Sequence, residues 1–176
     1  MINEIFFLFL SFGSEISAFG LSLRLDIPRS EAAELIDSYF EEYPRVKEYM
    51  DDTILFAKEN GFVETVSGRR RYLRDINSSN AMIRSAAERT AINTPIQGTA
   101  ADMIKLAMVG VHQALSEGGF KTKMILQVHD ELLFDMAIKE EEEIKEIVVE
   151  EMQNALPMEI PAVVDVDVGE NWLEAH

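Results

Sequence analysis

Apolar residues in the first half of the chain recur at helical spacing. Residues 30–40 place Ala33, Leu35, Ile36 and Phe40 on one side of a helix, with Ser30 as its expected N-cap. A second helix is expected from Pro44 to about Asn60. Proline suits the first helical turn, and Gly61 can end the helix in a left-handed conformation.

The middle of the chain alternates between short strands and one long helical pattern. Phe62–Val66 predicts a strand, and the polar residues 75–80 predict a loop. A helical pattern then runs from Ala81 to about Ser116. We expect Pro95 to kink or break it, because proline lacks the backbone N–H that the helix needs. The Gly118-Gly119 pair should end it.

Two apolar stretches, Met124–Val128 and Leu132–Met136, predict a hairpin with a charged junction. A helix from about Lys139 to Leu156 should follow, since its acidic opening favours a helix N-terminus. The alternating segment Ala162–Val168 predicts a last strand. Helices that enclose a few antiparallel strands define an α+β class.

Composition adds two constraints. The chain has 176 residues, one domain's length, and no cysteine, which excludes disulfides, thiolate metal sites and a cysteine nucleophile and suits a cytoplasmic protein. The opening apolar run, residues 1–12, contains Glu4 and no basic residue, and it is too short to cross a bilayer. We therefore expect neither a targeting segment nor a membrane association.

Charge is distributed unevenly. The net charge of −16 argues against a polyanionic partner when it is taken over the whole chain. Residues 66–125, however, contain nine basic and four acidic side chains, whereas residues 126–176 contain two basic and fifteen acidic ones. Because the local field decides where a polyanion docks, the middle segment is the candidate for nucleic-acid binding, with chance clustering on a solvated surface as the alternative.

The hairpin junction contains the adjacent carboxylates Asp130 and Glu131, which follow His129. A carboxylate held between two buried strands has little rotational freedom, and such rigidity suits a divalent-metal site. An ordinary solvated turn is the alternative. His129 by itself is more often a structural residue than a functional one.

Arg89, Asn93 and Gln97 follow one another at four-residue spacing, so they share one face of the long helix. A neighbouring apolar stripe, consisting of Ile92, Ile96, Ala100 and Met103, could anchor that helix. Hydrogen-bond donors in this arrangement can sense base-pair geometry in the minor groove, where all Watson–Crick pairs present similar acceptors. A solvated helix edge is the alternative.

Arg69, Arg70 and Arg71 follow Gly68 at an expected turn. Arginines at a turn are suited to contacts with backbone phosphates, although ordinary surface arginines would look the same.

Four motifs in fixed order resemble family A DNA polymerases, the bacterial polymerase I type. They are Ile16-Ser-Ala-Phe-Gly-Leu-Ser22, Gly68-Arg-Arg-Arg-Tyr72, the run from Ala86 to Asp102, and Gln127-Val-His-Asp-Glu131. The closing Gly169-Glu-Asn-Trp172 fits the same family, so the resemblance extends from about Ile16 to the C-terminus.

The resemblance implies template-directed DNA synthesis with Mg²⁺ as cofactor and primer–template DNA and deoxynucleoside triphosphates as partners. It assigns metal binding to Asp130, with Glu131 as the neighbouring acid, and minor-groove contacts to Arg89, Asn93, Gln97 and His129. It also implies that residues 1–78 form part of a fingers region and residues 79–176 the C-terminal part of a palm.

The sequence departs from the family in two places. The family's other metal-binding aspartate lies in a strand motif that nothing before Ile16 supplies, and no lysine or arginine precedes Arg24 to pair with a triphosphate. Residues 1–15 have an atypical start, as if an unrelated or frame-shifted segment were joined to a truncated polymerase. We therefore expect the 176 residues to be inactive alone and, because their palm sheet is incomplete, prone to self-association.

Two other functions remain open at this point. The chain could be a non-catalytic module that keeps only duplex binding. It could also be an acidic protein-interaction module built around the expected helix from Lys139 to Leu156.

Overall fold

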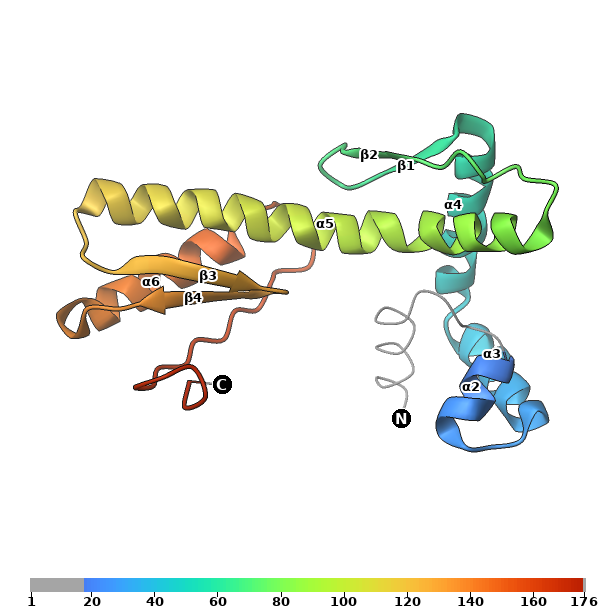
Figure 1. The fold of residues 1–176 in the computed structure, drawn as a ribbon, viewed down its shortest axis with the longest axis horizontal. Coiled ribbons are helices and arrows are strands. Elements are labelled where there is room, and N and C mark those ends of the chain that lie inside the picture. The colour runs from blue at the N-terminus through green and yellow to red at the C-terminus, as the bar shows by residue number, and fades with distance from the viewer. Residues whose placement is uncertain (1–17, 176) are drawn as a thin grey trace. The chain divides into compact units, whose positions relative to one another are not determined.

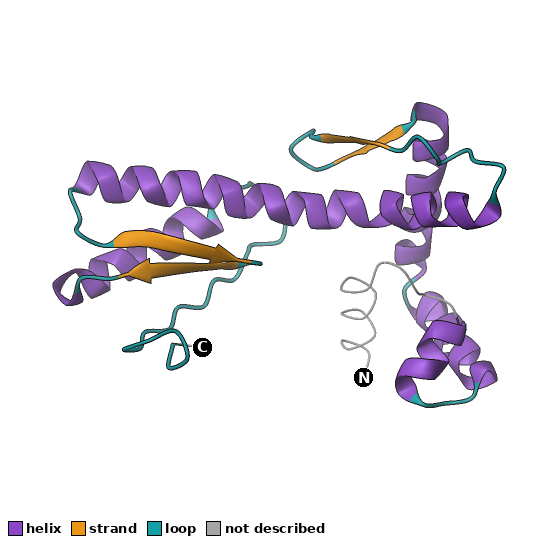
Figure 2. Ribbon diagram, in the orientation of Figure 1, coloured by secondary structure: helices purple, strands orange, loops and turns teal. Residues whose placement is uncertain are grey.

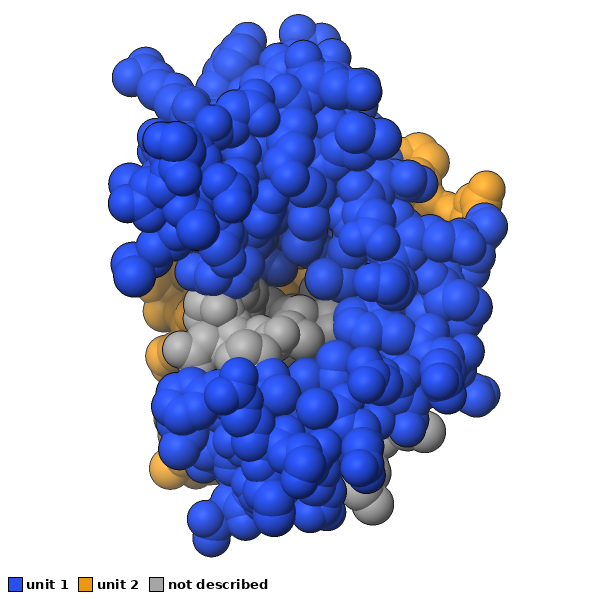
Figure 3. All heavy atoms as spheres, turned by 90° about the vertical axis from the view of Figure 1, so that its right-hand side faces the viewer, with its two compact units in different colours: residues 1–99 blue, residues 100–176 orange. Residues whose placement is uncertain are grey.

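The computed structural model describes residues 18–175, which belong to two compact units that meet between residues 99 and 100 of the chain (Figure 3). The atypical start, the apolar run 1–12 and the first two residues of the Ile16–Ser22 motif lie outside the described residues. In the described part of the chain, no helix is long and apolar enough to cross a membrane.

The first unit is mainly helical (Figure 1). Its elements are α2 (Ala18–Leu25), α3 (Arg29–Glu42), α4 (Pro44–Asn60), the antiparallel strands β1 (Phe62–Glu64) and β2 (Arg70–Tyr72), and the first part of α5 (Ala81–Gly118).

The ends of these helices test the expected caps. The prediction for α4 is confirmed at both ends, because Pro44 opens it and Gly61 closes it with φ of 77°. The cap predicted at Ser30 is wrong: Pro28 occupies the N-cap of α3, and no side chain caps that helix. The pyrrolidine ring fixes φ of Pro28 near −57°, and its ψ of 145° keeps it outside the helix, so the helix begins at Arg29 and Ser30 falls inside the first turn.

The core of the first unit joins α4, the β1–β2 hairpin and α5. Buried residues from these elements and from the loop after β2 form one cluster, consisting of Ala57, Val63, Leu73, Ile76, Ala87 and Ala91. On α5 the anchoring residues are therefore alanines four positions apart, which let the helix approach its neighbours closely. The predicted stripe is wrong in part, because Ile96 is 40% exposed and Ala100 is also exposed.

Helix α5 is continuous through Pro95, so the predicted interruption is wrong (Figure 2). The proline removes one backbone donor from a helix of 38 residues. The hydroxyls of Thr94 and Thr99 donate to the carbonyls of Thr90 and Pro95, at 2.7 and 2.5 Å, on either side of the imino acid. Buried clusters hold the helix before and after this point, so the loss of one donor does not break it.

The second unit contains the rest of α5, the hairpin β3 (Lys123–Val128) and β4 (Glu131–Asp135), the short 3₁₀ turn η1 (Ile138–Glu140) and α6 (Glu141–Gln153). The predicted hairpin is confirmed, with a bulge between Met124 and Leu126 on β3. Val111 and Leu115 of α5 pack on Ile144 and Val148 of α6, and Phe134 of β4 covers them. Helices around two small antiparallel sheets confirm the α+β class.

Glu140 ties the start of β3 to η1. Its carboxylate accepts hydrogen bonds from the backbone N–H groups of Lys121 and Thr122, each at 3.0 Å, and from the Thr122 hydroxyl at 2.7 Å. These bonds, that from the Lys121 backbone foremost, lower the pKa of Glu140 below its ordinary value of 4.5.

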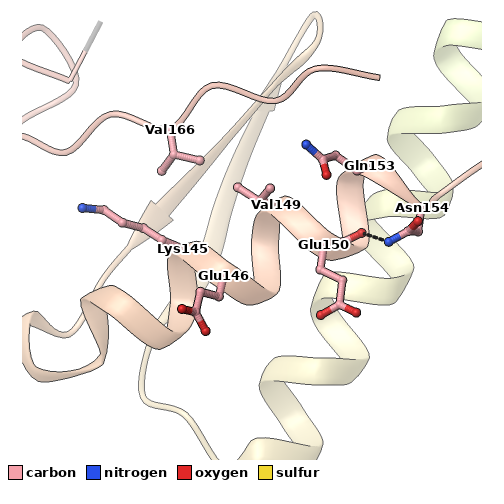
Figure 4. A pocket seen from close by; sticks show the side chains of 7 residues that line it. All are labelled: Lys145, Glu146, Val149, Glu150, Gln153, Asn154 and Val166. Carbon is pink, nitrogen blue, oxygen red and sulfur yellow. Dashed lines mark hydrogen bonds between the residues drawn. The ribbon is translucent and has the colours of Figure 1, made fainter. Parts of the chain in front are cut away.

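The segment after α6 contains no strand, so the strand predicted at 162–168 is wrong. A strand requires a neighbour that pairs with its backbone groups, and in the described part of this unit β3 and β4 pair only with each other. Val166 instead lies across α6 and helps to line a shallow hollow with Lys145, Val149 and Gln153 (Figure 4). Val163, at 84% exposed, contributes little to any core.

Candidate nucleic-acid interface

The loop between β1 and β2 is a tight turn of defined geometry. Gly68 has φ of +82°, a left-handed conformation that glycine adopts without a Cβ penalty. The N–H of Gly68 donates to the carbonyl of Thr65 at 2.9 Å, and the N–H of Arg69 donates to the Thr65 hydroxyl at 3.1 Å. The turn therefore determines where the three arginines emerge.

The structure assigns the three arginines different surroundings. The guanidinium of Arg69 donates to the carbonyl of Gly98 on α5 at 3.0 Å, so it fastens the loop to the helix. Arg70 lies 3.4 Å from the Glu64 carboxylate and 4.4 Å above the ring of Phe62. The side chain of Arg71 is exposed and, within residues 18–175, forms no hydrogen bond or ion pair, whereas its backbone pairs with Val63 in the hairpin. Of the three, Arg71 is the cation best placed to meet a phosphate.

Arg89, Asn93 and Gln97 lie on α5 as predicted. Arg89 and Asn93 are half-buried, Gln97 is exposed, and the Arg89 guanidinium donates to the Ser85 hydroxyl at 3.1 Å. These residues and the arginine loop belong to the same unit, and the loop contacts α5 at Gly98, the residue after Gln97.

Tyr49 on α4 supports this helix and was missed by sequence reasoning. Its hydroxyl donates to the Ile92 carbonyl at 3.2 Å. Burial raises the pKa of Tyr49 above its usual value of 10.0, opposed in part by a hydrogen bond with Thr53. A tyrosine on a different helix gives no signal in the local sequence pattern.

His129 and Asp130 form the two-residue turn of the β3–β4 hairpin in the second unit. His129 has φ of +53°, which is unusual for a residue other than glycine, and its carbonyl accepts a hydrogen bond from the Gln127 amide at 2.6 Å. Asp130 is exposed at the tip, and Glu131 begins β4 opposite Val128. A strained non-glycine residue at a turn is a common mark of a functional site.

The residues of this hairpin do not by themselves fit a metal site. No group of three or more histidine, aspartate or glutamate side chains in the described part of the chain could hold a metal ion. Mg²⁺ in phosphoryl-transfer enzymes is typically held by one or two carboxylates together with waters and substrate phosphates, so Asp130 and Glu131 supply only the protein part of such a shell. Asp130 thus lies exposed at the hairpin tip, with the Glu131 carboxylate next to it in the chain.

Comparison with protein families decides the ancestry. A model of DNA polymerase family A matches residues 10–174. This chain belongs to DNA polymerase family A. Family membership confirms the resemblance on which the four motifs were interpreted, and it covers nearly the whole described part.

Relatives of known name agree. The chain is 54% identical to DNA polymerase I of Caldicellulosiruptor bescii over 159 residues, and 49% identical to that of Pseudomonas aeruginosa over 161 residues. These matches cover 90% and 92% of this chain but only 19% and 18% of the relatives. The chain therefore spans less than a fifth of the length of these polymerases.

A solved structure shares the fold. The polymerase domain of Pol1 from M. smegmatis, in complex with a DNA primer–template and dNTP, superposes with a TM-score of 0.92 at 41% sequence identity. The match covers 99% of this chain and 30% of that one. The arrangement of helices and hairpins described above is thus that of one part of a family A polymerase domain.

Proposed function

We propose that this chain carries the primer–template-binding surface of a DNA-directed DNA polymerase that performs template-directed nucleotidyl transfer. The observation that carries the proposal is the fold match to a polymerase domain whose structure contains primer–template DNA and dNTP. Partial fingers and C-terminal palm regions, residues 1–78 and 79–176, remain our assignment of its parts, and a cytoplasmic location follows from the same proposal.

The DNA-contacting residues fall into two classes. Arg89, Asn93, Gln97 and His129 donate hydrogen bonds to minor-groove acceptors, which lie at similar positions in every Watson–Crick pair. Among Arg69, Arg70 and Arg71, the exposed Arg71 contacts a backbone phosphate directly, whereas the other two shape the loop. Such contacts sense duplex geometry and do not read sequence, as template copying requires.

Salt-dependent binding tests this assignment. We expect the 176-residue chain to bind a fluorescent primer–template, with affinity that falls as salt rises because phosphate contacts release counterions. An Arg89→Ala/Gln97→Ala variant should bind more weakly at every salt concentration. Arg45→Ala is the control, because Arg45 is an equally cationic but 91% exposed residue paired with Glu48 on α4. Unchanged affinity in the double variant would refute the minor-groove assignment.

Asp130 is proposed as one ligand of the polymerase's Mg²⁺ site, with Glu131 beside it. Among residues 18–175 no cluster of three or more histidine, aspartate or glutamate side chains surrounds them. We accordingly propose that the 176 residues alone bind duplex DNA and do not extend a primer with deoxynucleoside triphosphates and Mg²⁺. Primer extension that disappears in Asp130→Ala would contradict this and would mean that another carboxylate completes the site.

A non-catalytic duplex-binding module is the second candidate, and one observation favours it. The binding residues on α5 and the arginine hairpin are held by the chain's own contacts, whereas the metal ligands are incomplete. An acidic protein-interaction module centred on α6 is the third. Duplex binding without extension supports the second candidate, and absence of duplex binding supports the third.

Self-association is also proposed, because several large apolar side chains of the second unit are exposed. Val109 is 65%, Ile160 79% and Leu173 87% exposed. Exposed apolar surface of this kind favours association in water. Sedimentation velocity should show a concentration-dependent average mass, and a single monomeric species at all concentrations would contradict the expectation.

A further inference from the structure

The β1–β2 loop contacts α5 at one turn of the helix, through hydrogen bonds that involve Pro95, Gly98 and Thr99. The Thr99 hydroxyl accepts a hydrogen bond from the N–H of Val66 at 3.0 Å and donates to the Pro95 carbonyl at 2.5 Å. Thr99 is only 6% exposed, so this bond is largely protected from water. The buried hydroxyl thus accepts a hydrogen bond from the loop while it donates one within α5.

Gly98 makes the close approach of the loop possible. A Cβ at this position would lie 2.6 Å from Cγ2 of Thr65, which is itself 6% exposed. The Gly98 carbonyl also accepts the hydrogen bond from the Arg69 guanidinium. The loop is therefore fixed to α5 at two points, Val66 and Arg69, separated by the left-handed Gly68.

The fixed loop leads directly into β2, on which Arg71 pairs with Val63. Because Val63 is 1% exposed in the core, β2 cannot shift freely at that end. Among the described residues 62–72, the side-chain hydrogen bonds to α5 come from the loop end of this short hairpin, at Val66 and Arg69.

From this geometry we infer that Thr99 is a positioning residue, whose hydroxyl holds the arginine hairpin on α5 so that Arg71 reaches a DNA backbone phosphate. Arg69 acts with it as an anchor. This inference rests on the proposed DNA-binding function. It assigns Thr99, Gly98 and Arg69 a task that their residue types alone do not reveal.

Thr99→Val tests the inference, since valine keeps the shape and removes the hydroxyl. Thr99→Ser keeps the hydroxyl and is the rescue variant. Ser116→Ala on α5 is the matched control, because the Ser116 hydroxyl also donates to a carbonyl four residues earlier, that of His112 at 2.7 Å, without joining a loop to a helix. Two measurements are made on the full chain: amide hydrogen exchange at Val66, and the salt dependence of primer–template binding.

In Thr99→Val we expect faster exchange of the Val66 amide and a salt slope smaller by about one, the value for one phosphate contact. At 0.1 M salt that slope corresponds to an affinity loss of about eightfold. Arg71→Ala should lose the same amount, and Arg71→Ala/Thr99→Val should lose no more than either single variant. Thr99→Ser and Ser116→Ala should retain the original slope.

Three results would overturn the inference. Unchanged Val66 exchange in Thr99→Val would show that the hydroxyl does not hold the loop. Suppose Thr99→Val speeds Val66 exchange but leaves the salt slope unchanged, while Arg71→Ala lowers that slope. The hydrogen bond between Val66 and Thr99 would then not position Arg71. An unchanged slope in Arg71→Ala would show that Arg71 does not contact a phosphate. Whether the parent chain binds primer–template then shows separately whether the proposed function stands.

Discussion

Gly98→Ala has opposing effects that the structure allows us to weigh. In a helix interior, alanine is favoured over glycine by about 0.5–1 kcal/mol, so the change should stabilise α5 by itself. The new Cβ would lie 2.6 Å from Cγ2 of Thr65, whereas ordinary contacts begin near 3.4 Å. Overpacking of this kind costs about 1–3 kcal/mol.

Thr65 cannot easily rotate away from the new methyl group. Its hydroxyl accepts from the Arg69 N–H and lies 2.9 Å from the Ser67 hydroxyl, so rotation would break both contacts. The clash therefore outweighs the gain in helix propensity, and we expect Gly98→Ala to lower the free energy of unfolding by about 1 kcal/mol.

Gly110→Ala is the matched control on the same helix. There the nearest atom to a new Cβ is Oε2 of Glu151, at the far end of a flexible side chain that can move aside. We expect this variant to be stabilised by up to about 1 kcal/mol. Urea unfolding, with equal slopes confirmed for all variants, measures both.

Removing Cγ2 of Thr65 should reverse the sign of the stability change caused by Gly98→Ala. Thr65→Ser deletes Cγ2 and retains the hydroxyl, so Gly98→Ala in that background should become stabilising. A Gly98→Ala variant as stable as Gly110→Ala in the parent chain, or one that Thr65→Ser does not improve, would refute the close approach of loop and helix.

Two further predictions concern the second unit. His129→Gly should stabilise the hairpin by up to about 1 kcal/mol, because glycine adopts a φ of +53° without the Cβ penalty. The same variant should bind primer–template more weakly. Calorimetry and binding measurements check the two effects, and a destabilised variant would contradict the strain at His129. Glu140 has a lowered pKa in the folded chain, so its stabilising contribution is present above the ordinary carboxyl range near pH 4.5 and is lost as the pH falls through the folded-state value. Urea unfolding from pH 7 to pH 3 should show Glu140→Gln to be less stable at neutral pH and to lose less stability on acidification than the parent chain, and parallel pH curves for the two chains would contradict this role.

The local sequence determined the elements whose signals are local. Pro44 and Gly61 fix both ends of α4, because a proline φ and a left-handed glycine act within one turn. The β3–β4 hairpin follows from two apolar stretches around a polar junction. The family motifs likewise identified the polymerase ancestry, since they are contiguous strings of residue types in fixed order.

Tertiary structure decided the features that depend on distant partners. Pro95 stays within α5 because buried clusters hold the helix before and after it, and residues 162–168 form no strand because no described strand pairs with them. The three arginines look equivalent in sequence, yet Arg69 hydrogen-bonds to the Gly98 carbonyl and Arg70 forms an ion pair with Glu64. Contacts across 29 residues, such as that between Arg69 and Gly98, leave no periodic trace in the chain, so only the fold distinguishes an anchoring arginine from one whose guanidinium stays exposed.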